Sequence, residues 1–204
     1  SSLMKQADVL QGLYFFEDRF DEQTLQENFA FHEPRTVHES SLSPCVHAVL
    51  AASLDMPDKA YEMYLQTARL DLDDYNSEVH QGLHITSMAG TWMAVVEGFG
   101  GLRVKDDILH LSPSLPSKWS SFSFHVQFRG RSLKVEVGPK DARVTRISGE
   151  PLELLLAGEA GRGGRSSSRS PPRLRVHKRA AVACDSSTLG AILTECSLSL
   201  SLSL

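Results

Sequence analysis

The first hundred residues place apolar side chains three and four positions apart, which is the spacing of amphipathic helices. Residues 8–16 and 21–29 are two such stretches, and acidic residues begin the second, where the helix dipole favours negative charge. Ser43 followed by Pro44 predicts a third helix with a serine cap. Pro57 opens a fourth. Short loops between these stretches favour antiparallel helix pairs.

A last helix is predicted from about residue 82 to residue 98. Its sequence is nearly apolar throughout, so we expect it to be buried on most sides. The small residues Ala89, Gly90 and Ala94 would allow close packing against neighbouring helices.

The spacing of apolar residues is different between residue 101 and about residue 156. Apolar side chains alternate with polar ones over 122–128 and again over 133–137, and Arg129-Gly130 lies between them as a turn candidate. This alternation predicts a β-hairpin. Further short strands are expected at 102–104, 108–111, 144–147 and 152–156. The fold class predicted is α+β, with helices followed by a small antiparallel β domain.

Residues 158–204 differ from the rest in composition. The stretch 158–175 is rich in Gly, Ser, Arg and Pro, which is typical of disorder, and Ser-Leu repeats end the chain. The segment is locally basic, and a basic tail can bind nucleic acid. An unstructured end is the preferred interpretation, so nucleic-acid binding is not expected.

Composition narrows the function classes. The 204 residues are 41% hydrophobic and 23% charged with a net charge of −4, an ordinary globular composition that does not suit a polyanion-binding protein. Cys45, Cys184 and Cys196 form neither an even framework nor a C-x-x-C pair. A reducing, cytoplasmic compartment is expected, without a disulfide scaffold, signal peptide or membrane span.

Two polar loops run directly into apolar helices, at 35–44 (RTVHESSLSP) and 82–92 (GLHITSMAGTW). Each places hydroxyl groups, a histidine and backbone N–H groups at a helix N-terminus, where an anion is stabilised. Two such helix starts close together would form a phosphate site.

These loops also belong to a series of motifs that occur together in a known family. In chain order the motifs are 5–10 (KQADVL), 35–44, 68–74 (ARLDLDD), 82–92, 109–113 (LHLSP), 115–119 (LPSKW) and 128–135 (FRGRSLKV). Over residues 3–156 the chain resembles glycoside hydrolase family 65, in its maltose phosphorylase branch. The segment after residue 158 does not.

The resemblance implies an (α/α)6 catalytic barrel followed by a C-terminal β domain. This chain would supply the last barrel helices at 1–104, the β-sheet domain at 105–157 and a non-family, disordered tail at 158–204.

The resemblance also implies an inverting phosphorylase that converts maltose and phosphate into β-glucose 1-phosphate and glucose. The family's general acid is a glutamate upstream of Lys5, and no counterpart is found in this chain, so no catalytic residue is assigned. Two alternatives stay open. One is an inactive carbohydrate- or phosphate-binding fragment, and the other is a family 65 hydrolase with Glu39 as base.

By the same resemblance, Lys5 and Gln6 would bind the glucosyl unit, and Ser40, Ser41 and His84 would bind phosphate. Each assignment has a structural alternative. Lys5 and Gln6 could be a solvated helix start, the serines could cap a helix, and His84 could be a core histidine.

Inorganic phosphate is expected as co-substrate, without an organic cofactor or metal, and homodimers are common in the family. His38 and His47 are expected to be structural. A metal cluster of His32, His38, His80 and His84 is disfavoured because no zincin-like helical motif joins them.

Overall fold

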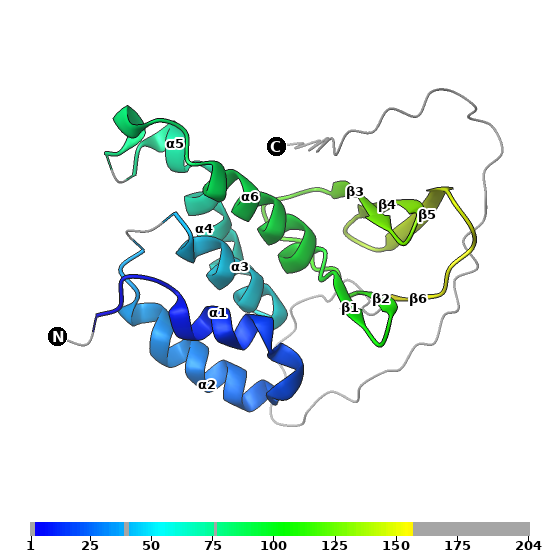
Figure 1. The fold of residues 1–204 in the computed structure, drawn as a ribbon, viewed down its shortest axis with the longest axis horizontal. Coiled ribbons are helices and arrows are strands. Elements are labelled where there is room, and N and C mark those ends of the chain that lie inside the picture. Colours follow the sequence, from blue (N-terminus) through cyan, green and yellow to red (C-terminus); the bar gives the residue numbers. More distant parts are fainter. Residues whose placement is uncertain (1–2, 39–40, 76, 157–204) are drawn as a thin grey trace. The chain divides into compact units, whose positions relative to one another are not determined.

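The computed structural model describes residues 3–38, 41–75 and 77–156. It divides into two compact units, one ending at Gly101 and the other beginning at Leu102 (Figure 1). The first unit contains α1 (Asp8–Phe15), η1 (Glu17–Arg19), α2 (Glu22–His32), η2 (Glu33–Arg35), α3 (Ser43–Ser53), α4 (Pro57–Ala68), α5 (Leu70–Asp73), η3 (Val79–Gln81), α6 (Ile85–Met93) and the π-helical η4 (Ala94–Phe99). The second contains β1 (Arg103–Lys105), β2 (Ile108–Leu111), β3 (Phe122–Phe128), β4 (Arg131–Val137), β5 (Ala142–Ser148) and β6 (Leu154–Leu156).

Helix α3 is the centre of the helical unit. Every residue from Ser43 to Ala51 is buried, and α1, α4, α6 and η4 all pack on this helix. Small and apolar side chains dominate its sequence, so neighbouring helices can approach it from several directions.

The start of α3 differs from the prediction. Ser43 does not cap the helix, which begins at Ser43 itself, after Leu42. The Ser43 hydroxyl instead accepts a hydrogen bond of 3.1 Å from the backbone N–H of Ala7, the residue before α1. Packing of α1 on α3 brings this otherwise unpaired N–H within reach of Ser43, so the serine joins two helices.

The predicted helix over 82–98 is wrong in two respects. Gly82 has a φ of 108°, which L-residues rarely adopt, so the chain turns there and α6 begins only at Ile85. Burial on most sides is confirmed for the π-helical end, where Ala94, Val95, Val96 and Phe99 are buried, but it is wrong for α6, where Ile85 is 66% exposed and Met88 46% exposed. Only Ser87 and Gly90 of α6 are buried, because the helix packs on α3 and α4 along a narrow face.

The second unit consists of two three-stranded sheets with the orders β1-β2-β6 and β3-β4-β5. The predicted hairpin is confirmed. Strands β3 and β4 pair in antiparallel register around Arg129 and Gly130, whose positive φ values of 50° and 73° are those of a tight hairpin turn. The α+β class is therefore confirmed, although there are two sheets and β2 pairs with β6 in parallel.

The hairpin is apolar on one face and polar on the other. Phe124 opposes Val135 and Val126 opposes Leu133 on the apolar face, while Ser123 opposes Glu136 on the polar face. The domain boundary after residue 104 stays a prediction, and the tail at 158–204 lies outside the described residues. Within the described ranges, no helix has the length and apolar character needed to cross a membrane.

Candidate functional site

The two predicted anion loops meet at the start of α6. Ser41, which lies just before α3, has its hydroxyl oxygen 3.2 Å from the hydroxyl oxygen of Thr86 in the first turn of α6. His84 is the residue immediately before that helix. The fold thus brings Ser41 next to the turn that follows His84. Ser40 and Glu39 lie outside the described residues.

His84 is held by two carboxylates. Its Nδ1 lies 2.5 Å from Oδ1 of Asp71, and its backbone N–H donates to Oδ2 of the same carboxylate over 2.9 Å. Its Nε2 lies 3.7 Å from a carboxylate oxygen of Glu78. An ionised carboxylate only accepts hydrogen bonds, so Asp71 holds the proton of His84 on Nδ1 and leaves Nε2 for another ligand.

Asp71 is a site residue that sequence reasoning missed. From sequence alone, Asp71, Asp73 and Asp74 are typical of a solvated loop after a helix, but in the structure each carboxylate has a defined partner. The hydrogen bonds from the His84 side chain and backbone lower the pKa of Asp71. Asp73 binds Arg69, and Asp74 accepts from the backbone N–H of Val79. The only signal in the sequence for a role of Asp71 was its place in a cluster of acidic residues, which does not identify His84 as its partner.

The segment containing Lys5 and Gln6 is tied to both ends of the loop that carries Ser41. On one side, the backbone of Met4 accepts from Val37 over 2.9 Å and donates to Arg35 over 2.8 Å. On the other side, Ala7 donates to Ser43. Lys5 is exposed and Gln6 is half-buried. The predicted sugar-binding and phosphate-binding segments therefore lie at the same end of the helical unit.

A pocket of about 280 Å³ lies beside Ser41. Side chains from the loop, from the first turn of α3 and from α4 to α6 line it, namely Val37, His38, Ser41, Pro44, Gln66, Leu70, Tyr75 and Ser87. Its walls combine apolar groups with hydroxyl, amide and imidazole groups, a mixture that suits a polar ligand. Neither Lys5 nor Gln6 lines it.

His38 is a half-buried residue of this loop, and its ring contacts that of His47, which is buried in α3. Burial lowers the pKa of His47 to about 3, assisted by His38 and Lys59, so the ring is neutral at pH 7. Burial also lowers the pKa of His38, with Lys59 acting in the same direction and Glu33 and Glu62 opposing it. Both rings lie inside the fold, where a positive charge is disfavoured.

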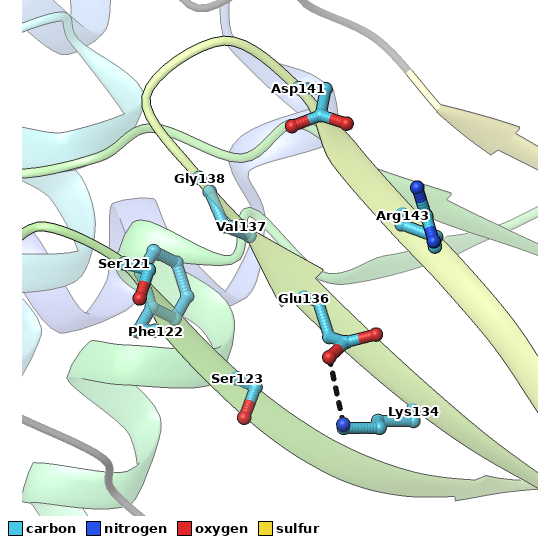
Figure 2. A pocket seen from close by; sticks show the side chains of 9 residues that line it. All are labelled: Ser121, Phe122, Ser123, Lys134, Glu136, Val137, Gly138, Asp141 and Arg143. Atoms are coloured by element: carbon cyan, nitrogen blue, oxygen red, sulfur yellow. Dashed lines mark hydrogen bonds and ion pairs between the residues drawn. The ribbon is translucent and has the colours of Figure 1, made fainter.

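A second pocket, of about 420 Å³, lies on the polar face of the β3-β4-β5 sheet (Figure 2). An ion pair of 2.7 Å between Lys134 and Glu136 lies at its floor, and Asp141 and Arg143 stand along β5 and the loop before it. None of the predicted site residues lines this pocket. The helical unit is therefore the better candidate for the functional site.

Comparisons with known proteins agree with this assignment of the two units. The model of the glycosyl hydrolase family 65 central catalytic domain matches residues 1–93, and that of the family 65 C-terminal domain matches residues 102–160. Maltose phosphorylase of Bacillus subtilis (strain 168) is 51% identical over 154 residues, which cover 76% of this chain and 20% of that protein. Alpha,alpha-trehalose phosphorylase of Thermoanaerobacter brockii is 43% identical over 152 residues, 74% of this chain and 20% of that protein.

A solved structure named "Putative kojibiose phosphorylase from human microbiome" matches with a TM-score of 0.74 and 34% identity, covering 82% of this chain and 26% of its own. The chain spans about a fifth of the length of the curated relatives it matches. Its helical unit corresponds to part of the catalytic domain and its strands to the C-terminal domain. The resemblance seen in the sequence is confirmed, and the chain belongs to glycosyl hydrolase family 65.

Proposed function

We propose that this chain is part of an inverting α-glucoside phosphorylase that converts maltose and phosphate into β-glucose 1-phosphate and glucose. The observation that carries the proposal is the contact between Ser41 and Thr86, because it joins the two predicted anion-binding helix starts. The phosphorylase names of the relatives support the reaction class.

In this proposal phosphate binds at Ser40, Ser41 and His84. Hydroxyl groups donate to phosphate oxygens without adding the negative charge that would repel them. Thr86 adds a further hydroxyl beside Ser41. Asp71 fixes the ring of His84 through Nδ1, so Nε2 would face the phosphate in place of its present neighbour, Glu78.

The bound phosphate would then attack the anomeric carbon of a glucosyl unit held by Lys5 and Gln6. A phosphorylase of this kind uses phosphate where an inverting hydrolase uses an activated water, and one carboxylic acid protonates the leaving oxygen. That acid would come from a glutamate outside this chain. The chain's own part is to bind the glucosyl unit and phosphate and to orient the phosphate toward the sugar.

The hydrolase alternative depends on Glu39, and the binding-only alternative depends on the missing acid. Glu39 lies outside the described residues, and the contact between Ser41 and Thr86 brings hydroxyl groups together rather than a carboxylate. We therefore favour the phosphorylase. A cytoplasmic location, a homodimer and the lack of a cofactor remain predictions from the sequence.

A segment exchange tests the proposal. The matching 154-residue segment of Bacillus subtilis maltose phosphorylase is replaced by the corresponding residues of this chain. We expect the hybrid to release β-glucose 1-phosphate from maltose only when inorganic phosphate is present. Glucose release that is independent of phosphate would favour the hydrolase, and a folded hybrid without either product would contradict both enzymes.

A further inference from the structure

Three side chains with metal-binding atoms meet beneath the loop that carries Ser41. Glu33 comes from η2, His38 from the loop and His47 from the buried helix α3, and one ligand atom from each lies within 4.8 Å of the other two. None of the sequence motifs linked these residues, because His47 is fourteen positions from Glu33 and lies on another element.

The two histidines have unused hydrogen-bonding atoms. All four ring nitrogens of His38 and His47 are buried, and none has a hydrogen-bond partner among the described residues. Buried polar atoms without partners are rare in folded proteins and call for an explanation. The ring centroids are 4.5 Å apart and the planes are nearly perpendicular. One nitrogen of each ring lies within 4.8 Å of the other and of a Glu33 carboxylate oxygen, so a bound ion could satisfy both.

The backbone supports this explanation. His38 has a φ of 55°, a left-handed conformation that is uncommon for a residue with a side chain. Such conformations are concentrated at ligand sites, where the surrounding structure holds them in place. Here the conformation places the imidazole of His38 against His47 rather than in solvent.

The surrounding charges suit a divalent cation. Lys59 of α4 lies 2.8 Å from one oxygen of Glu33 and 3.2 Å from an oxygen of Glu62. Because a carboxylate has two oxygens, Glu33 can bind a metal ion and Lys59 together. Around the two imidazoles, the two carboxylates and one ammonium leave a net charge of −1.

We propose that Glu33, His38 and His47 bind one divalent transition-metal ion of the zinc type, with water completing the coordination. Two imidazole nitrogens and one carboxylate oxygen form a common zinc ligand set. Zinc bonds of about 2.0–2.2 Å place tetrahedral ligand atoms about 3.4 Å apart, so ligand atoms that now lie within 4.8 Å of one another need to close by at most about 1.4 Å. The ion would join η2 to α3 and fix the entry to the loop of Ser41.

The test uses the full chain, stripped with a chelator and titrated with Zn²⁺ or Co²⁺ alone by calorimetry. We expect one ion per chain, a rise in melting temperature, and a Co²⁺ visible spectrum of nitrogen and oxygen ligands without a sulfur charge-transfer band. Glu33→Gln and His38→Gln should each weaken binding by about tenfold or more. Both residues are only partly buried, so the variants should fold, which far-UV circular dichroism checks.

His125→Gln is the matched control, since it removes an exposed histidine of β3 and should leave binding unchanged. Lack of binding would overturn the proposal. So would binding that Glu33→Gln and His38→Gln leave intact, or a sulfur-to-cobalt band that places the ion on a cysteine.

Discussion

Asp71 and His84 are thirteen positions apart and are joined by two hydrogen bonds, one to the imidazole Nδ1 and one to the backbone N–H. The backbone bond fixes where α6 begins, and the side-chain bond fixes how the ring is turned. A carboxylate of the short helix α5 therefore sets the orientation of the histidine proposed to bind phosphate.

Asp71→Asn should destabilise the helical unit at pH 7, and the difference from wild type should decrease in acid. The pKa of Asp71 is lowered below its ordinary value of 3.8 by its hydrogen bonds with His84. A group with a lowered pKa stabilises the fold above the ordinary value, and this stabilisation is lost as the pH falls through the lowered pKa. Urea unfolding at pH 7, 5 and 3 should show a gap between wild type and variant that is the same at pH 7 and 5 and narrower at pH 3. Asp18→Asn, at an exposed position, is the control, and a gap that stays constant with pH would contradict the account.

Substitution of Ser43 should lower the free energy of unfolding, whereas substitution of Ser41 should leave it nearly unchanged. Ser43→Ala leaves the buried N–H of Ala7 without its acceptor, which costs about 1–3 kcal/mol. Ser41→Ala changes an exposed contact and should alter stability by no more than about 0.5 kcal/mol. Chemical denaturation of both variants measures the difference, and equal losses would be inconsistent with Ser43 as the structural residue.

Gly90 should not tolerate a methyl group, because a Cβ there would lie 2.7 Å from the Cβ of Cys45 and 2.9 Å from its sulfur. We expect Gly90→Ala to lose about 1–3 kcal/mol through overpacking of α6 against α3. Gly12→Ala is the matched control, since nothing lies within 4 Å of a Cβ in α1 and alanine favours the helix by about 1 kcal/mol. Thermal melting should move in opposite directions for the two variants. A stabilised Gly90→Ala would show that the helices do not approach this closely.

A second glycine pair tests the strand unit. Gly149 has a φ of 89°, and a Cβ there would lie 2.5 Å from the carbonyl oxygen of Gly130. Gly130 itself has a φ of 73° but open space around it. Gly130→Ala should cost about 1–2 kcal/mol of backbone strain, and Gly149→Ala should cost more because backbone atoms must also move. Denaturant unfolding of the strand unit gives the order, and the reverse order would contradict this packing.

The local elements could be predicted because their signals lie within a few residues of one another. Alternation of apolar and polar residues identified β3 and β4, and Arg129-Gly130 identified the turn between them. The parallel pairing of β2 with β6 could not be predicted, because partners such as Leu109 and Leu154 are 45 positions apart and leave no local pattern. The family resemblance, rather than periodicity, identified the protein class.

In the candidate site, too, some features could be predicted from the sequence and others depend on tertiary packing. The family resemblance selected Ser41 and His84, and the fold brings their two segments together. Sequence reasoning missed Asp71 and misplaced Ser43, because both act on residues that only tertiary packing brings near. It also disfavoured a metal cluster of His32, His38, His80 and His84, and it did not link His38 with Glu33 and His47, which no short motif joins.

The most direct test of the account is the Michaelis constant for phosphate in the hybrid phosphorylase that carries Ser41→Ala. A hydrogen bond to a charged group contributes about 1.5–3 kcal/mol, so the constant for phosphate should rise by about 10- to 100-fold. The constant for maltose should change little, because Lys5 and Gln6 are intact. An unchanged constant for phosphate, or an equal rise in both constants, would contradict the proposed phosphate site.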